Sequence, residues 1–137
     1  MNLNYGPEYK NFKKEVIAFC KKWEGVHFID EAKVLMNPIT KVGGIKITRT
    51  EWQSILIKEG YFARSIPKEY GGYGGESDVI KNRIIASEFS NHRIPSPMSG
   101  QGIDMLVPTL LELGTEEQKK QYIEKTLLGE IIWCQGY

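Results

Sequence analysis

The chain has 137 residues, enough for one domain with a hydrophobic core, and we expect it to fold without a metal. Its 18 Lys and Arg residues nearly balance 17 Asp and Glu residues, and the net charge of +1 excludes a whole-protein field that would attract nucleic acid. Cys20 and Cys134 lie far apart, which argues against a metal site or a disulfide framework, and both are predicted to be core residues. No apolar run is long enough to span a membrane and no signal-peptide core is present, so we expect a soluble, cytoplasmic protein.

The first predicted helix begins at Pro7, because proline and the carboxylate of Glu8 both suit a helical first turn. Apolar side chains then recur at spacings of three and four residues from Tyr9 to Trp23. This spacing forms one stripe, which predicts a helix that faces the core and ends near Gly25.

The segment that follows, 26–47, has no hydrophobic period and is interpreted as a long surface excursion. His27 and His92 are isolated from other ligand residues, so both are interpreted as ordinary histidines without a metal or base role. A second helix is predicted from the capping box at Thr48 and Glu51 to a left-handed C-cap at Gly60.

A glycine-rich corner, PKEYGGYGG over residues 67–75, separates this helix from the next one. Proline and the glycine pairs exclude a helix and predict positive φ angles. The glycine spacing is neither that of a P-loop nor that of a dinucleotide fingerprint, and Tyr70 and Tyr73 place rings where a phosphate needs bare backbone. The corner is therefore predicted to be structural, with Gly72 required because of its φ angle.

The third predicted helix follows Ser77 and Asp78, which are both suited to its N-cap, and ends before Pro95. Its predicted buried side comprises Ile80, Ile84, Ile85 and Phe89, and its predicted solvent side comprises Lys81, Glu88 and Asn91.

The segment 97–114 is poor in charge and is predicted to be mostly buried. Pro108 removes a helical hydrogen bond, so the segment is either one kinked helix or two helices that meet there. The small residues Ser99, Gly100 and Gly102 leave room beside the helix, and this room suits either close helix packing or the apolar tail of a ligand.

The last predicted helix begins with a capping box at Thr115 and Gln118 and ends at Gly129. The tail IIWCQGY, residues 131–137, is apolar, aromatic and β-branched and is interpreted as a strand. Because a lone strand needs a partner, we expect the chain to be a piece of a larger protein or to pair with another chain.

Four stretches of the chain, in their order and spacing, resemble the N-terminal helical domain of acyl-CoA dehydrogenases. They are the helix ending at Trp23, ARSIPKEYGGYGG from Ala63, MLVPTLLELGTEEQKKQYIEKTLLGE from Met105, and IIWCQGY. The resemblance implies an all-α helical bundle with a single terminal β-strand. It assigns residues 1–130 to the N-terminal helical domain and residues 131–137 to the start of a middle β domain. The family's sharper signature, T/S-E-P-x-A-G-S-D, would follow Tyr137.

Family members use FAD to remove a proton and a hydride from the α and β carbons of an acyl-CoA, in lipid metabolism such as fatty acid β-oxidation. The resemblance implies that the catalytic base lies in a later helical bundle, so that Asp104, Glu112 and Glu130 are not candidates. This chain alone is then expected to be inactive and to retain no flavin.

Two sets of site residues follow from the resemblance. The fatty-acyl cavity is expected to be lined by Ser96, Pro97, Met98, Ser99 and Gly100. Gln135 and Tyr137 align with the family's first flavin contacts, although Gln135 replaces an aromatic residue of some relatives.

The expected partners are an acyl-CoA substrate and the remainder of the dehydrogenase chain or a partner subunit, in a homo- or hetero-oligomer. The alternative is a non-catalytic helical module that offers its terminal strand to a partner's sheet. A DNA-binding domain is disfavoured, because the charge is near neutral and no helix has a basic face.

Overall fold

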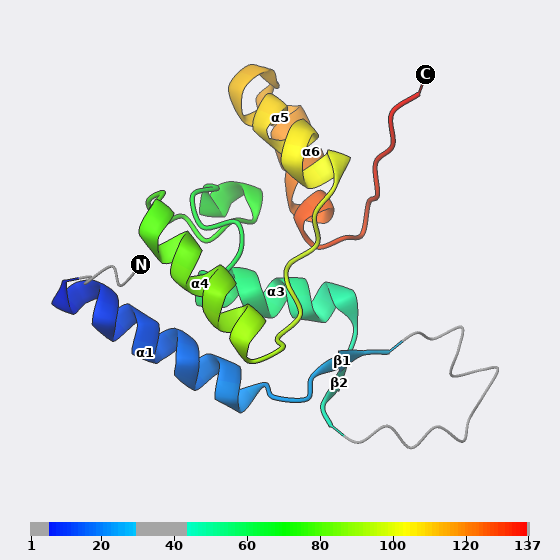
Figure 1. The fold of residues 1–137 in the computed structure, drawn as a ribbon. Coiled ribbons are helices and arrows are strands. Elements are labelled where there is room, and N and C mark those ends of the chain that lie inside the picture. The colour runs from blue at the N-terminus through cyan, green and yellow to red at the C-terminus, as the bar shows by residue number, and fades with distance from the viewer. Residues whose placement is uncertain (1–5, 30–43, 137) are drawn as a thin grey trace. The chain divides into compact units, whose positions relative to one another are not determined.

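The structure is a computed structural model that describes residues 6–29 and 44–136 (Figure 1). The described part of the chain is mostly helical, which confirms the predicted fold class. Contacts divide the chain into one unit of residues 1–47 and 78–96 and a second unit of residues 48–77 and 97–137. In the described ranges no helix is long and apolar enough to cross a membrane.

The first unit is built on α1 (Pro7–Lys22) and α4 (Val79–Asn91), which lie side by side (Figure 1). The predicted start of α1 at Pro7 is confirmed, and its predicted stripe buries Phe12, Val16 and Phe19. The rings of Phe19 and Phe89 stack with centroids 5.8 Å apart, which joins the two helices through aromatic contact.

The N-terminus of α4 is capped as predicted by Asp78, whose carboxylate accepts hydrogen bonds from the backbone N–H groups of Ile80 and Lys81. Both bonds lower the pKa of the Asp78 carboxyl group, and the bond from the Lys81 N–H has the largest effect. The phenol of Tyr9 donates a third hydrogen bond, 3.2 Å long, to the same carboxylate. One side chain thus caps α4 and ties it to α1.

The prediction that Glu88 faces solvent was wrong, because its side chain is buried between α1 and α4. The carboxylate lies 3.7 Å from Lys13 Nζ and 3.6 Å from His92 Nδ1, and the charge of the Lys13 ammonium offsets part of the cost of burial. His92 is therefore not isolated, since it lies one helical turn after Glu88 and its Nδ1 is also 2.9 Å from the Glu88 carbonyl oxygen.

The segment predicted as an irregular excursion forms a short parallel pair, β1 (His27–Phe28) and β2 (Lys46–Ile47). His27 pairs with Lys46 and Phe28 with Ile47. Ile47 is buried, and so is Val26 beside β1. The prediction was wrong here because two-residue strands are too short to show a period, and its central part, 30–43, lies outside the described residues.

The second unit begins with α3 (Arg49–Glu59), whose predicted capping box and C-cap are both confirmed. Thr48 and Glu51 exchange hydrogen bonds of 3.2 and 3.0 Å, and Gly60 has a φ of 82°. The bond from the Thr48 backbone N–H lowers the pKa of Glu51. The buried amide of Gln53 donates to the carbonyl of Leu127 and accepts from the N–H of Met98, both at 2.9 Å.

The glycine-rich corner contains one turn of 3-10 helix, η1 (Lys68–Tyr70), and Tyr70 is buried. Positive φ angles occur at Gly71 (90°) and Gly74 (74°), as predicted for this corner. The predicted reason for Gly72 was wrong, because its φ is not positive. Gly72 is required because a Cβ there would collide with the carbonyl oxygen of Ile66.

A π-helical turn, η2 (Gly102–Leu106), leads directly into α5 (Val107–Leu113), and Leu106 and Val107 both have right-handed helical φ and ψ angles. The backbone thus stays helical across Pro108, in the first turn of α5, so the alternative of one helix holds rather than that of two helices meeting there. The prediction that this stretch is mostly buried was wrong, since Met105 is 53% and Leu113 is 78% exposed. A low charge predicts burial only if another part of the protein covers the side chains.

The last helix, α6 (Glu116–Leu127), lies beside α5 and begins with the predicted capping box at Thr115 and Gln118 (Figure 1). The core of this unit consists of Ile57, Tyr70, Val107, Ile123 and Leu127.

The predicted strand at 131–137 is not formed within the described residues, which reach Gly136. Residues 132–136 have no regular secondary structure, because no other strand of the described chain supplies a ladder. In the same segment Cys134 is exposed, contrary to the prediction, whereas Cys20 is buried as predicted.

Candidate functional site

The backbone around Gly100 is shaped by a reciprocal pair of hydrogen bonds with Asp104. The Gly100 N–H donates to the Asp104 carboxylate, and the Asp104 N–H donates to the Gly100 carbonyl, both at 2.8 Å. Gly100 has a φ of 134°, which a residue with a side chain rarely adopts. Asp104 therefore holds the turn that leads into η2.

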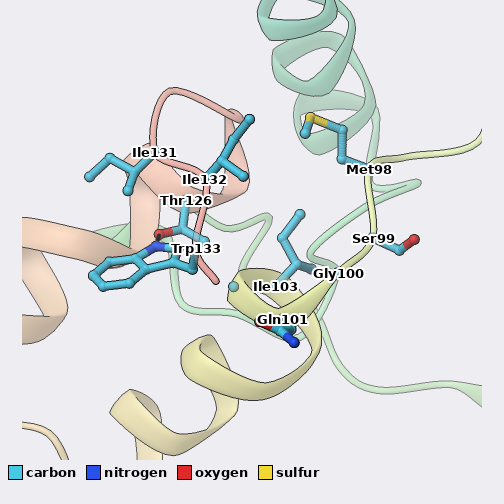
Figure 2. A pocket seen from close by; sticks show the side chains of 10 residues that line it. Met98, Ser99, Gly100, Gln101, Ile103, Thr126, Ile131, Ile132 and Trp133 are labelled. Atoms are coloured by element: carbon cyan, nitrogen blue, oxygen red, sulfur yellow. Dashed lines mark hydrogen bonds between the residues drawn. The ribbon is translucent and has the colours of Figure 1, made fainter. Parts of the chain in front are cut away.

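Trp133 is fixed by three contacts within the same unit. Its indole Nε1 donates a 2.9 Å hydrogen bond to the hydroxyl of Thr126 (Figure 2). That hydroxyl itself donates to the Tyr122 carbonyl at 2.6 Å. The indole also meets the Tyr122 ring edge-to-face, with centroids 5.5 Å apart. The third contact is with Gly102, where an added Cβ would lie 2.6 Å from the indole Cδ1.

A small pocket of about 50 Å³ lies beside this indole (Figure 2). It is lined by residues 98–103, Thr126 and residues 131–133. Three of the predicted acyl-cavity residues, Met98, Ser99 and Gly100, are thus brought together at one pocket. The other two, Ser96 and Pro97, do not line it, and Ser96 belongs to the first unit.

A large pocket of about 220 Å³ lies against η2 and α5. Its lining consists of Gln101, Met105, Leu106, Thr109, Trp133, Cys134 and Gln135. The predicted flavin contact Gln135 therefore lines a different pocket from Met98. The other predicted flavin contact, Tyr137, lies outside the described residues.

Gln101 and Trp133 are the two residues that line both pockets. The Gln101 amide also donates to the Gln135 amide oxygen at 3.5 Å, a long hydrogen bond between exposed side chains. Sequence reasoning missed both residues. The signal for Trp133 in the sequence was the tryptophan itself, because a buried indole N–H needs a hydrogen-bond acceptor. The sequence does not show that this acceptor is the hydroxyl of Thr126, seven residues earlier.

Neither pocket is lined by an Asp, Glu, Lys, Arg or His side chain of the described chain. Such a lining suits an apolar chain with a few hydrogen-bonding groups, because a charged ligand group would find no countercharge. In the described ranges, no group of three or more His, Cys, Asp or Glu residues could hold a metal ion.

The described residues are mostly helical, and the two pockets described above, both in the second unit, are lined by uncharged side chains. The chain matches the model of the family "Acyl-CoA dehydrogenase, N-terminal domain" over residues 7–130. The chain therefore belongs to the acyl-CoA dehydrogenase family, in which it corresponds to the N-terminal domain.

Individual relatives agree with this assignment. The chain is 34% identical over 89 residues, 65% of its length, to acyl-CoA dehydrogenase IpdE1 of Mycolicibacterium smegmatis, and it spans 22% of that protein. It is 23% identical over its whole length to acyl-CoA dehydrogenase FadE26 of Mycobacterium tuberculosis, of which it spans 32%. A solved structure titled "Tcur3481-Tcur3483 steroid ACAD" shares 26% identity and a TM-score of 0.58, covering 96% of this chain and 32% of that one. The chain thus spans a third or less of these relatives.

Proposed function

We propose that the chain forms the N-terminal part of an FAD-dependent acyl-CoA dehydrogenase that introduces an α,β double bond into an acyl thioester. In this proposal residues 1–130 are the helical domain and residues 131–137 begin a β domain. Family membership supports the reaction type. The two free cysteines suit a reducing compartment, and we place the protein in the cytoplasm and in fatty-acid or related lipid oxidation.

The observation that carries the proposal is the uncharged lining of the large pocket, between η2 and α5 on one side and residues 133–135 on the other. Met105 and Leu106 offer apolar surface, and Gln101 and Gln135 offer amide groups at its margin. This combination suits an acyl chain that runs past the edge of a neutral ring system. We assign the acyl chain to this pocket, and Met98, Ser99 and Gly100, which line the adjoining small pocket, to the far wall of the acyl cavity beyond Trp133.

The residues present fit one edge of a flavin. The exposed amide of Gln135 can donate and accept hydrogen bonds, and we assign it and Tyr137 to that edge. When bound, FAD would supply the hydride acceptor. The role of this chain is to exclude water from one side of the acyl chain and to orient it.

The chain's own carboxylates near the pockets have structural or solvent-facing roles. Asp104 is held by the Gly100 N–H, and Glu112 and Glu130 are exposed. We therefore assign the base that removes the α proton to a part of the enzyme outside these 137 residues.

A direct test is the DNA sequence after codon 137, which we expect to encode a run close to S-E-P-G-A-G-S-D. The second test is biochemical: the purified 137-residue chain should show no flavin absorbance and should oxidise no acyl-CoA with an artificial electron acceptor. Turnover by this chain alone would contradict the assignment of the base.

A protein that contains these 137 residues and continues beyond them, called the longer protein below, allows a residue-level test of the flavin edge. Gln135→Leu should lower the flavin content of the purified longer protein, while Gln121→Leu, on the exposed face of α6, should leave it unchanged. Equal flavin content in both variants would remove Gln135 from the flavin site. Because one relative's title names a steroid enzyme, CoA thioesters of steroid side chains should be assayed beside fatty acyl-CoAs.

The second candidate is a non-catalytic helical subunit that binds a dehydrogenase-like partner. It is favoured by the exposed apolar side chains of Met105, Leu113 and Ile132, which a partner would cover. A solved structure of the same fold is titled "Crystal structure of the ChsE4-ChsE5 complex from Mycobacterium tuberculosis" (22% identity, TM-score 0.58). Light scattering after size-exclusion chromatography would separate the candidates, since a discrete assembly without flavin favours the subunit.

A further inference from the structure

The side chain of Trp133 stands between the two pockets. It lines the small pocket together with Met98 (Figure 2). It also lines the large pocket together with Met105. We propose that Trp133 is a specificity-determining residue that closes the small pocket to an acyl chain held in the large one, and so limits how far the chain extends. The inference rests on the proposed function for its substrate.

The position of the indole is fixed rather than adaptable. The hydrogen bond to Thr126 and the edge-to-face contact with Tyr122 hold the indole on α6, and Thr126 is itself 2% exposed. A side chain held by a directional bond and an aromatic contact does not swing aside without losing both. The indole is therefore suited to act as a wall.

Gly102 provides the space that the indole occupies. Gly102 is buried at the start of η2, and an added Cβ would lie 2.6 Å from the indole Cδ1 and 3.0 Å from the Thr126 methyl group. Neither neighbour is the end of a flexible chain. An alanine at position 102 would thus displace the indole from its place against Gly102. Gly102→Ala is therefore a second substitution that should open the wall between the pockets.

The volumes indicate what the wall does. The large pocket has about 220 Å³ and the small pocket about 50 Å³. Removing the indole joins the two spaces and adds its own volume, so that a longer or bulkier acyl group gains room next to Met98. In an apolar pocket, room for even one extra methylene changes kcat/KM by about tenfold or more, so partial opening of the wall is measurable.

The chain carries natural reporters for a test, because Met98 lines one pocket and Met105 the other. We would label methionine methyl groups with ¹³C in the 137-residue chain and add S-decanoyl-N-acetylcysteamine, an uncharged acyl thioester. In the parent, intermolecular NOEs from the decanoyl chain should reach Met105 and not Met98. NOEs to Met98 in the parent, or to neither methionine, would overturn the proposal.

Variants then test the wall itself. Trp133→Ala and Gly102→Ala should each let the decanoyl chain reach Met98, whereas Trp133→Phe, which keeps a ring, should not. Leu113→Ala, an apolar truncation at a 78% exposed position outside both pockets, is the matched control and should behave as the parent. Trp133→Leu replaces the alanine variant if circular dichroism shows that the latter is unfolded. If a folded Trp133→Ala or Gly102→Ala variant shows no NOEs between the decanoyl chain and Met98, the proposal is contradicted.

A kinetic arm uses the longer protein. There, Trp133→Ala should raise the ratio of kcat/KM for hexadecanoyl-CoA to that for octanoyl-CoA by about tenfold. An unchanged ratio would overturn the specificity role. If the longer protein oxidises no acyl-CoA while the NOE pattern holds, the proposed reaction fails and the wall between the pockets stands.

Discussion

The phenol of Tyr70 donates a 2.6 Å hydrogen bond to the carboxylate of Glu116, which joins the glycine-rich corner to the first turn of α6. The bond raises the pKa of Tyr70 to about 12, with burial as the next cause, and it lowers the pKa of Glu116. Lys119 lies over the Tyr70 ring, 5.7 Å from its centroid, and 3.4 Å from the Glu116 carboxylate. The corner is thus tied to a helix 46 residues away in the sequence.

Tyr70→Phe should therefore destabilise the chain by removing this bond while keeping the ring. We expect a fall of several degrees in the Tm measured by circular dichroism. Tyr73→Phe, in the same corner, is the control, because within the described residues the Tyr73 hydroxyl makes no hydrogen bond. An equal fall in both variants would show that the Tyr70 bond contributes nothing of its own.

The same pair predicts how stability depends on pH. The pKa of Glu116 is lower in the folded state, so its contribution is complete above its ordinary value of 4.5 and is lost as the pH falls through the folded value. The pKa of Tyr70 is higher in the folded state, so its contribution is complete below 10.0 and is lost as the pH rises through about 12. Urea unfolding across the pH range should show both losses in the parent and smaller ones in Tyr70→Phe.

The glycine-rich corner yields a second stability prediction. Gly72→Ala should cost about 1–3 kcal/mol, because its Cβ meets the backbone carbonyl of Ile66, which cannot move aside as a side-chain end can. Gly72→Val should cost more. Gly136→Ala, where nothing lies within 4 Å of an added Cβ, is the control, and a Gly72→Ala midpoint in urea equal to that of the control would refute the steric explanation.

Gln53 should be among the side chains most sensitive to replacement in the second unit. Gln53→Leu leaves the Leu127 carbonyl and the Met98 N–H without their partner, and we expect a loss of about 2–4 kcal/mol in the free energy of unfolding. Hydrogen exchange at the Met98 amide should accelerate as well. Ser54→Ala, at the exposed next position, should change neither quantity.

What the sequence predicted well is local. The capping boxes at Thr48 and Thr115 each involve partners three residues apart, so both ends of the interaction are visible in one short stretch. The site depended on distant pairs. Trp133 meets Gly102, and Gln53 meets Met98 and Leu127, across separations that no periodicity encodes.

Burial was mispredicted where it depends on neighbours rather than on residue type. Glu88 is buried because Lys13 and His92 stand beside its carboxylate, although its position in the helical pattern favoured solvent. Met105 is exposed although it is apolar, because no part of the described chain covers it. In both cases the burial of the side chain depends on residues that are distant in the sequence or outside it. A pattern in one sequence does not identify such neighbours.

The two cysteines should differ sharply in reactivity. Burial, with a smaller effect from the charge of Glu88, raises the pKa of the Cys20 thiol to about 11, and its side chain is 0% exposed, whereas Cys134 is exposed. Because the thiolate is the reactive form, Ellman's reagent at pH 8 should titrate one thiol in the native chain and two in guanidinium chloride. Cys134→Ser should abolish the native reaction, and Glu88→Gln should leave Cys20 protected because burial dominates. A rapid second thiol in the native parent would show that the contact between α1 and α4 opens readily, and would contradict the burial of Cys20.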